Sequence, residues 1–599
     1  MGTCKENRKK KPKKVICSSD NPAYAIKDKC LCFLKDVNSN GKPVYFPLCN
    51  FVAQCIEEVL RDDGREAILE FVISGTLNNG TPLAPVTIKA SDFAGMGWIP
   101  KHWGIKAMVS AGSSLRDKLR VAIQLHSQDA PKRKIYAHTG WRKIDGVWVF
   151  LHGGGAIGSD GLGVEVDLGT DLGRYRLPMS GDLNAAQASL RFLEITPWEI
   201  TAPIIASIYL ATLSDVLGVN FTLWIHGRTG SYKSSLIALA LSHFGDFDLS
   251  TLPGQWSSTA NALEHRAFIL KDMPFVIDDF SPGMNRREAQ GLEEKAHRVL
   301  RATGNRAGRQ RLTSDLSAAQ TYYPRCLVIS TGELLPSGHS IVARSFTVEM
   351  QQGQVSLAKL SQGQSAKALY SQAMSAFLAW LAPQIDELKT EIQGTVFPDY
   401  RARFQAAGHP RLPEAQAWLQ IGFELFTRFL GTMGAISEAT GKDMNDRAWE
   451  VFRTLGERHS QVIEKEKPAL KALSVLRDLL FQGNVYVSRI GGGPSQIVSE
   501  MGGADIDPPR DREFIGWEGN GDGFLYLRPD PTFQAIQKAM KQREDFLGLK
   551  KNGLLKALAG EGIIQSSPKE EHTQPKTIEG KSHRVLCLFS DRLLNVEES

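Results

Sequence analysis

The feature that most constrains this chain is a glycine loop between a strand-like and a helix-like segment. Residues 221–226 (Phe-Thr-Leu-Trp-Ile-His) are mostly apolar, residues 227–235 carry two glycines followed by Lys233 and Ser234, and residues 236–240 are apolar helix formers. Strand, loop and helix in this order are typical of an α/β sheet, in which the loop N–H groups and the helix N-terminus together bind an anion. The segment therefore predicts a phosphate site.

The loop residues provide what a nucleoside triphosphate needs. We expect Gly227 and Gly230 to allow the backbone to turn, Lys233 to reach the phosphate charge, and Ser234 to ligate Mg²⁺. The predicted cofactor-binding residues are Gly227, Arg228, Thr229, Gly230, Ser231, Tyr232, Lys233, Ser234 and Ser235. Tyr232 departs from the usual pattern, which has glycine before the lysine. The loop alone would also fit an ordinary turn, since such junctions commonly use Gly and Ser.

Two later strand-like segments end in groups that could act on a bound triphosphate. Residues 274–277 run into Asp278 and Asp279, and residues 326–329 run into Ser330 and Thr331. Because the carboxyl ends of parallel strands meet at one edge, we expect Asp278 to bind the Mg²⁺ shell and Asp279 to polarise the attacking water. Thr331 is then a sensor of the γ-phosphate. The Asp279 side chain is shorter than glutamate, which predicts slower hydrolysis.

Arg344 follows the third of these segments and could complete the site of a neighbouring subunit as an arginine finger. Each of the four elements is ambiguous by itself, and their order favours a bound nucleotide. The predicted catalytic residues are Lys233, Asp278, Asp279, Thr331 and Arg344.

A run of arginines spaced by glycines lies between residues 298 and 311. Arginine binds phosphate groups bidentately, so a flexible cationic loop would suit contact with a nucleic-acid backbone. The predicted DNA contacts are Arg301, Arg306, Arg309 and Arg311. The alternative is a solvated helix face.

The net charge of +6 is concentrated in residues 1–14, where seven basic residues face only Glu6. This tail is expected to be disordered, as a solubilising arm or a nucleic-acid contact. The longest apolar stretch, residues 200–213, contains Pro203 and is too short to cross ~30 Å of hydrocarbon. It predicts a buried helix, no membrane partner and a cytoplasmic location.

Six of the eight cysteines lie within the first 55 residues, but only Cys30 and Cys32 are close together, with one residue between them. Structural zinc sites usually have paired ligands two to four residues apart. The spacing therefore favours buried thiols over zinc, which stays the alternative.

Several segments resemble the domain-of-unknown-function 927 family: residues 136–158, the Gly227 loop, residues 259–264 and residues 322–333. The resemblance covers most of the first 350 residues. It implies a helicase-like, AAA+-related ATPase of phages, plasmids and genomic islands. ATP and Mg²⁺ as cofactors, single-stranded or forked DNA as partner, and a ring of subunits such as a hexamer are what this resemblance implies.

The expected fold class is multidomain α/β. The order of strand-like and helix-like segments predicts a basic tail (1–14), a β-rich N-terminal domain (15–192), a P-loop (AAA+/RecA-like) ATPase core (193–355), a helical region (356–480) and a C-terminal winged-helix-like domain (481–599).

The leading hypothesis is an ATP-dependent nucleic-acid motor, a DNA helicase or translocase that replicates a mobile element. The rival is a nucleotide-gated DNA-binding initiator, or an inactivated helicase relative without significant hydrolysis, which Tyr232 and Asp279 favour. A defence ATPase built on the same core is a third possibility.

Overall fold

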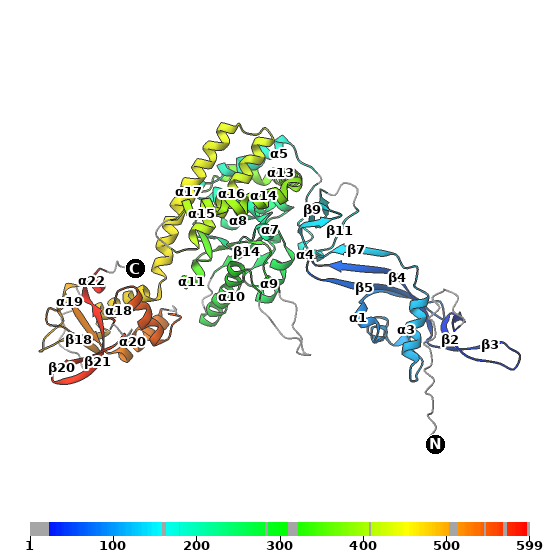
Figure 1. Cartoon of the computed structure of the whole chain (residues 1–599), viewed down its shortest axis with the longest axis horizontal. Coiled ribbons are helices and arrows are strands. Elements are labelled where there is room, and N and C mark those ends of the chain that lie inside the picture. The colour runs from blue at the N-terminus through cyan, green and yellow to red at the C-terminus, as the bar shows by residue number, and fades with distance from the viewer. Residues whose placement is uncertain are drawn as a thin grey trace, which may run out of the picture. The chain divides into compact units, whose positions relative to one another are not determined.

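The computed structural model describes residues 23–158, 163–178, 180–281, 285–308, 322–405, 409–501, 512–543, 547–566 and 572–595. The chain forms two compact units (Figure 1). The first contains Met1–His138 with Ser159–Gly169, and the second contains Thr139–Gly158 with Thr170–Ser599. The first unit thus ends earlier than the expected boundary at residue 192.

The first unit is rich in β-structure, as the sequence predicts. Its larger sheet has the strand order β11-β7-β4-β5-β6, and its smaller sheet the order β1-β2-β3. The elements are β1 (Tyr24–Lys27), β2 (Cys30–Val37), β3 (Pro43–Pro47), β4 (Phe51–Asp62), β5 (Ala67–Leu77), β6 (Pro82–Lys89), α1 (Ala90–Phe93), α2 (Trp98–Trp103), α3 (Leu115–Leu125), β7 (Lys132–Tyr136) and β11 (Glu165–Val166). Cys30, Cys32 and Cys49 are buried thiols, and the described residues contain no group of three or more side chains suited to a metal ion.

A five-stranded parallel sheet forms the centre of the second unit. Its order is β13-β14-β15-β12-β16, so β15 separates the strand before the glycine loop from the strand that carries the two aspartates. The strands are β12 (Thr222–His226), β13 (Gly254–Gln255), β14 (Pro274–Phe280), β15 (Leu327–Gly332) and β16 (Ser345–Glu349). Residues 222–225 of β12 are fully buried, as expected of an apolar strand with neighbours on both sides.

Helices follow or precede each strand of this sheet. They are α4 (Gly169–Leu172), α5 (Leu183–Arg191), α6 (Trp198–Ala211), α7 (Ser214–Leu217), α8 (Lys233–Leu241), α9 (Ala260–Ile269), α10 (Arg286–Asn305) and α11 (His339–Val342). Helix α6 is buried over almost its whole length, which confirms the buried helix expected at this apolar stretch. In the part of the chain that the structure describes, no helix is both long and apolar enough to span a bilayer.

A β-meander expected in the N-terminal domain lies in the second unit instead. It consists of β8 (Gly140–Ile144), β9 (Val147–His152) and β10 (Gly155–Ile157), and Asp145-Gly146 forms the expected turn, with both residues at positive φ. Trp141 is 1% exposed and its indole Nε1 donates to the Thr212 carbonyl at 2.8 Å. Trp141 is therefore a core aromatic, and it anchors the meander to the helices that precede β12.

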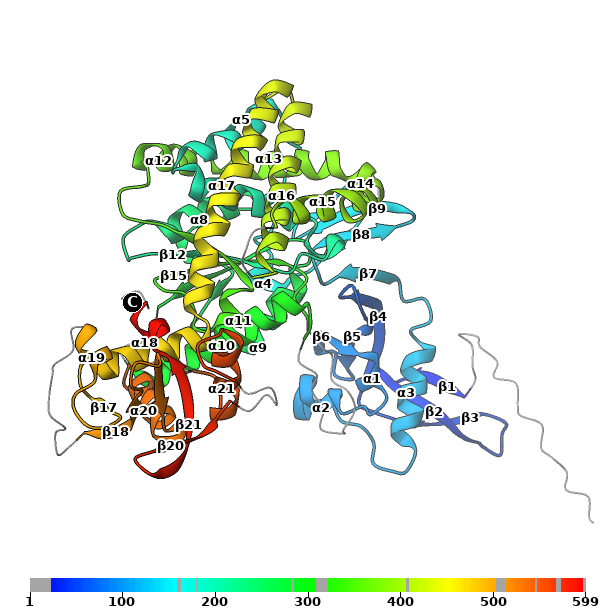
Figure 2. The ribbon, with the colours of Figure 1, turned by 60° about the vertical axis from the view of Figure 1, so that its left-hand side comes forward.

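Long helices dominate residues 356–465, as the sequence predicts. They are α12 (Leu357–Ser365), α13 (Lys367–Leu381), α14 (Ile385–Glu391), α15 (Phe397–Arg403), α16 (Leu412–Thr432) and α17 (Glu438–Lys465). Helix α16 packs against α6 and α17, and Figure 2 shows the long α17 beside α16. The helical region thus covers the sheet through α6.

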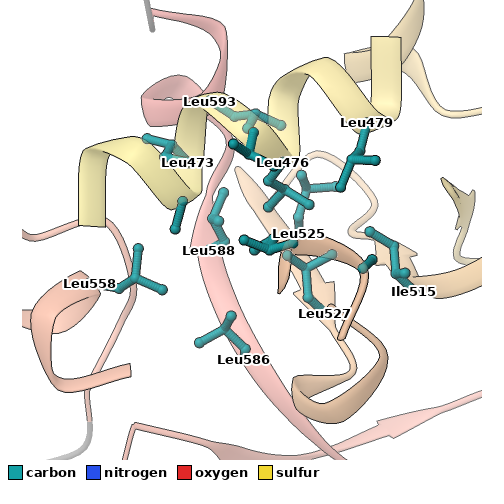
Figure 3. Close-up of a cluster of buried hydrophobic side chains, with 14 of the residues drawn as sticks. Leu473, Leu476, Leu479, Ile515, Leu525, Leu527, Leu558, Leu586, Leu588 and Leu593 are labelled. Carbon is teal, nitrogen blue, oxygen red and sulfur yellow. The ribbon is translucent and has the colours of Figure 1, made fainter. Parts of the chain in front are cut away.

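The C-terminal part has its own core and a five-stranded sheet of order β17-β18-β19-β21-β20. Its elements are α18 (Pro468–Phe481), β17 (Val485–Arg489), α19 (Gln496–Glu500), β18 (Glu513–Glu518), β19 (Phe524–Leu527), α20 (Pro529–Gln542), α21 (Lys551–Gly560), β20 (Gln574–Ile578), β21 (Lys581–Phe589) and α22 (Ser590–Leu594). Leucines of α18, β19 and β21 meet in this core (Figure 3). A strand, two helices and a hairpin occur in the order expected, whereas β17 and β18 were not anticipated.

Candidate nucleotide-binding site

The glycine loop connects β12 directly to α8 at the carboxyl edge of the parallel sheet. Gly227 has φ +146°, and a Cβ there would lie 2.1 Å from the Met350 carbonyl oxygen. Gly230 has φ +83°. Only glycine satisfies both the backbone angle and the close approach at position 227, so the loop conformation is fixed by its sequence.

Tyr232 occupies the N-cap of α8 with φ 65° and ψ 22°, the left-handed conformation that explains why the usual pattern has glycine here. Its side chain is 46% exposed, so the ring is not packed inside the loop. Tyr232 in place of the usual glycine therefore leaves the backbone path of the loop unchanged, but it introduces backbone strain.

Lys233 is only 8% exposed, and its ammonium group lies within the loop. The Nζ atom donates to the Gly227 carbonyl at 2.6 Å, to the Arg228 carbonyl at 3.0 Å and to Ser231 Oγ at 3.2 Å. Burial lowers the pKa of Lys233, and three nearby carboxylates partly oppose this shift: those of Glu333, Asp278 and Asp279. The loop thus holds a cation among acceptors that phosphate oxygens could replace.

Ser234, Asp278 and Thr331 converge from three elements. Ser234 Oγ donates to Asp278 Oδ1 at 2.7 Å, and Thr331 Oγ1 donates to the same oxygen. Ser234 lies in the first turn of α8, Asp278 in β14 and Thr331 in β15. The sequence placed these groups at one sheet edge, and the structure brings them into direct contact.

Asp279 follows at a bulge, where the register between β14 and β15 shifts between Ile277 and Phe280. Its φ of 65° is left-handed, and its backbone N–H donates to Thr331 Oγ1 at 3.2 Å. Burial raises the pKa of Asp279, and the neighbouring Asp278 and Glu333 carboxylates raise it further, against the opposing effect of Lys233. A carboxylate with a raised pKa is a better proton acceptor.

Glu333 is a site residue that the sequence reasoning did not assign. It follows β15 directly, accepts a hydrogen bond from the Thr229 hydroxyl, and influences the pKa of both Lys233 and Asp279. Its position two residues after Thr331, at the carboxyl end of a parallel strand, is the signal that could have identified it.

Arg344 lies just before β16, among other cationic groups. Its guanidinium donates to the Ser340 carbonyl and hydroxyl and, at 3.3 Å, to Asn305 Oδ1, all of them uncharged partners. Its Nε is buried without a partner among the described residues. Burial lowers the pKa of Arg344, and nearby Arg411 and Arg301 lower it further. A cluster of three arginines of this kind favours the binding of an anion.

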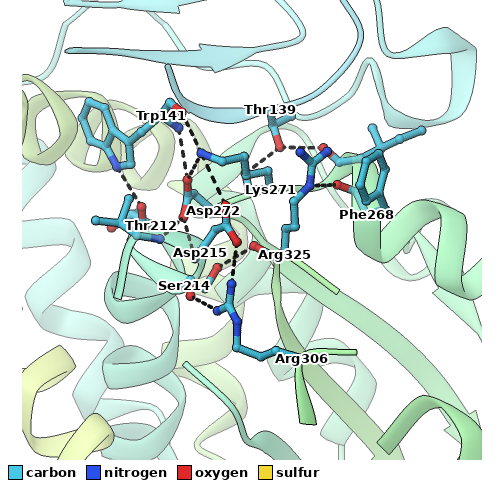
Figure 4. Close-up of polar contacts among 12 residues, drawn as sticks. Thr139, Trp141, Thr212, Ser214, Asp215, Phe268, Lys271, Asp272, Arg306 and Arg325 are labelled. Carbon is cyan, nitrogen blue, oxygen red and sulfur yellow. Dashed lines mark hydrogen bonds and ion pairs between the residues drawn. The ribbon is translucent and has the colours of Figure 1, made fainter. Parts of the chain in front are cut away.

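Arg301 and Arg306, two of the predicted DNA contacts, lie in different environments in the structure. Arg301 is exposed on α10. Arg306 instead caps α10 and pairs with Asp215 at 2.5 Å, while also donating to the Ser214 carbonyl at 2.7 Å (Figure 4). This pairing favours a structural role over the expected DNA contact, because the guanidinium is already occupied. Arg309 and Arg311 lie outside the described residues.

The remaining loop residues line the same turn. Arg228, Thr229 and Gly230 are exposed, and Gln352 Nε2 donates to the Thr229 carbonyl at 2.9 Å. Ser231 Oγ donates to the Arg228 carbonyl at 2.9 Å, and Ser235 is half-buried in the first turn of α8.

The residues present fit a magnesium–nucleotide complex. Mg²⁺ prefers oxygen ligands and is usually bound by one or two protein groups plus substrate phosphates. The hydroxyl of Ser234 and the carboxylate of Asp278 are of this kind and lie beside the buried Lys233 ammonium. The same helix N-terminus and loop N–H groups suit phosphate oxygens.

The parallel sheet, glycine loop and convergent carboxylates define a candidate nucleotide-binding α/β domain. The family model described as domain of unknown function (DUF927) matches residues 107–313, which include the loop and both aspartates. The resemblance expected from the sequence is thereby confirmed for this segment. No curated protein matches the chain.

Solved structures extend this comparison to the fold. A structure titled "SCCmec type IV Cch - active helicase" is similar with a TM-score of 0.55 and 16% identity, over 96% of this chain and 98% of that one. The chain therefore shares the fold of that helicase over nearly its whole length. The apo A form of the NrS-1 C-terminal region is also similar, with a TM-score of 0.31 and 10% identity over 90% of this chain and 96% of that one.

Proposed function

We propose that this protein is an ATP-dependent nucleic-acid motor, a DNA helicase or translocase that serves replication of a mobile element. The observation that carries the proposal is the contact between Ser234 and Asp278, 2.7 Å apart, beside the buried Lys233. A hydroxyl, a carboxylate and an ammonium group in this arrangement are what binding of a magnesium–triphosphate complex requires.

Each side chain then has a defined role. Lys233 binds the β- and γ-phosphate oxygens, and Ser234 and Asp278 would hold Mg²⁺. Asp279 accepts a proton from the water that attacks the γ-phosphorus, while the bond from that phosphorus to the β–γ bridging oxygen breaks and ADP leaves. Thr331, which already contacts Asp278 and the Asp279 backbone, positions these two residues against the γ-phosphate. Mg²⁺, when bound, neutralises charge that develops on the phosphate oxygens.

Assignment to the AAA+/RecA-like class is supported by the strand order, in which β15 lies between the loop strand and the acidic strand. The fold similarity to an active helicase and the DUF927 match favour DNA as the partner. The order β19, α20, α21, β20–β21 hairpin supports a C-terminal winged helix, a module that often binds duplex DNA. A hexameric cytoplasmic ring completes the proposal.

The test is the Lys233→Ala variant, assayed for ATP hydrolysis and for unwinding of a forked DNA. Both activities should be lost while the melting temperature stays near that of the wild type, because the ammonium stabilises phosphate charge. Lys442→Ala, which removes an exposed lysine of α17, is the matched control and should retain both. Normal unwinding by Lys233→Ala contradicts the proposal.

The alternative is a nucleotide-gated DNA-binding initiator, or an inactive helicase relative. The strained Tyr232 and the short Asp279 favour it. A steady-state ATPase assay with and without single-stranded DNA separates the two functions, because only a motor turns ATP over faster when DNA is present. A defence ATPase would share this turnover.

A further inference from the structure

A cavity of about 360 Å³ adjoins the glycine loop at the carboxyl ends of β12 and β16. His226, which lines it, is paired in register with Glu349 and directly precedes Gly227. The volume falls in the range of roughly 300–1,000 Å³ typical of small-molecule pockets. A ligand held by the loop would therefore have room for a further part beside it.

Both apolar and polar side chains line the cavity. Pro197 and Ile200 at the start of α6 and Leu455 and Val462 on α17 supply the apolar walls. The rim consists of exposed side chains that can donate or accept hydrogen bonds: Glu199, Glu349, Gln351 and Arg458. A flat group with apolar faces and a polar edge matches this distribution.

His459 lies in the lining and is 1% exposed. Neither of its ring nitrogens makes a hydrogen bond of normal distance and angle among the described residues, although the Val342 backbone is close enough to oppose the fall in the pKa of the ring. Burial lowers the pKa of His459 to about 3, so the ring is neutral and offers one donor and one acceptor. Buried polar atoms without partners are costly, and a ligand that pairs with them is stabilised accordingly.

The loop and the cavity are connected through the segment after β16. The Met350 carbonyl packs directly against Gly227, and Gln352 Nε2 donates a hydrogen bond to the Thr229 carbonyl at 2.9 Å. Glu349 and Gln351, on either side of Met350, line the cavity. One ligand can therefore contact both places.

We propose that this cavity binds the purine base and ribose of the nucleotide whose triphosphate is held by the loop. The inference rests on the proposed function of the loop. The apolar walls contact the faces of the base, Arg458 and the buried imidazole of His459 pair with its ring nitrogens, and the Glu199 and Glu349 carboxylates accept hydrogen bonds from its exocyclic amine and the ribose hydroxyls.

The experiment compares two probes, ATP and inorganic tripolyphosphate, by isothermal titration calorimetry with Mg²⁺. The full chain should bind ATP at least about tenfold more tightly than tripolyphosphate, because only ATP fills the cavity. CTP should bind more weakly than ATP. Equal affinities for ATP and tripolyphosphate, or for ATP and CTP, overturn the assignment of a purine pocket.

Two variants localise the effect. Val462→Trp fills the cavity and should weaken ATP binding about tenfold or more without changing tripolyphosphate binding. Arg458→Ala, a milder change at the rim, should weaken ATP selectively, whereas Arg453→Ala on an exposed turn of the same helix should not. Equal weakening of both probes, or of neither, by Arg458→Ala contradicts the proposal.

Failure of the loop itself gives a different result. If neither probe binds, or if Lys233→Ala leaves the binding of both probes unchanged, the triphosphate site is absent. The proposed base pocket is then refuted as well. If tripolyphosphate binding depends on Lys233 but ATP has no advantage over it, only the base pocket is refuted.

Discussion

At the scale of the residue, the pKa of Asp279, the proposed general base, is set by its neighbours. Burial, Asp278 and Glu333 raise the pKa of Asp279, and only its ionised form accepts a proton. ATP hydrolysis should therefore fall as the pH drops through this raised pKa, above the ordinary value of about 3.9 for aspartate. Glu333→Gln removes one negative neighbour, so the acid limb of a kcat–pH profile should move to lower pH. Glu194→Gln, on the surface, should leave it in place.

A second prediction at the residue scale concerns the left-handed backbone of Tyr232. A left-handed backbone costs a non-glycine residue roughly 1–2 kcal/mol, partly offset by the greater chain entropy of glycine. Tyr232→Gly should thus raise the free energy of unfolding by about 0.5–1 kcal/mol. Ser235→Gly, in the first turn of the same helix, should lower it by a similar amount. Chemical denaturation of the three proteins measures the differences, and destabilisation by Tyr232→Gly would contradict the strain argument.

At the scale of the element, the C-terminus of α10 is held by a polar network that spans several segments. Arg306 pairs with Asp215, whose backbone N–H donates to the buried Asp272, and Asp272 in turn accepts from the Trp141 backbone (Figure 4). Arg306→Ala should lower the free energy of unfolding by roughly 2 kcal/mol, since it removes charge-assisted hydrogen bonds from a half-buried carboxylate.

Arg301→Ala is the matched change on the same helix. It should leave stability unchanged and, if Arg301 contacts DNA, weaken binding and reduce the salt dependence by about one phosphate contact. Equal stability of the two variants would contradict the structural role of Arg306.

At the scale of the whole molecule, the site is proposed to be completed between subunits. Arg344, with its uncharged partners and the neighbouring Arg411, fits the role of an arginine finger for a phosphate of the next subunit. Arg344→Ala should reduce ATP hydrolysis by roughly 10³ to 10⁵. Mixing equal amounts of the Arg344→Ala and Lys233→Ala variants should restore activity to about a quarter of that of the wild type. In randomly assembled rings, about a quarter of the interfaces combine an intact Lys233 from one subunit with an intact Arg344 from its neighbour. Mixtures that stay inactive would contradict action between subunits.

The sequence by itself determined the loop and the strands that carry the site. Apolar runs before Gly227, Asp278 and Thr331 fix parallel strands, and glycine at positive φ fixes the turn, because both depend on local side-chain chemistry. The helical region followed from hydrophobic periodicity in the same way, and so did β19, α20, α21 and the β20–β21 hairpin of the C-terminal part, whereas β17 and β18 did not.

Only the tertiary structure decided which groups meet. Glu333 joins the site, Arg306 pairs with Asp215, and the β8–β10 meander belongs to the second unit. His459 is buried beside a cavity. Each of these outcomes depends on contacts between residues far apart along the chain. Local periodicity carries no information about such contacts, since they arise from the strand order and from the packing of helices against the sheet.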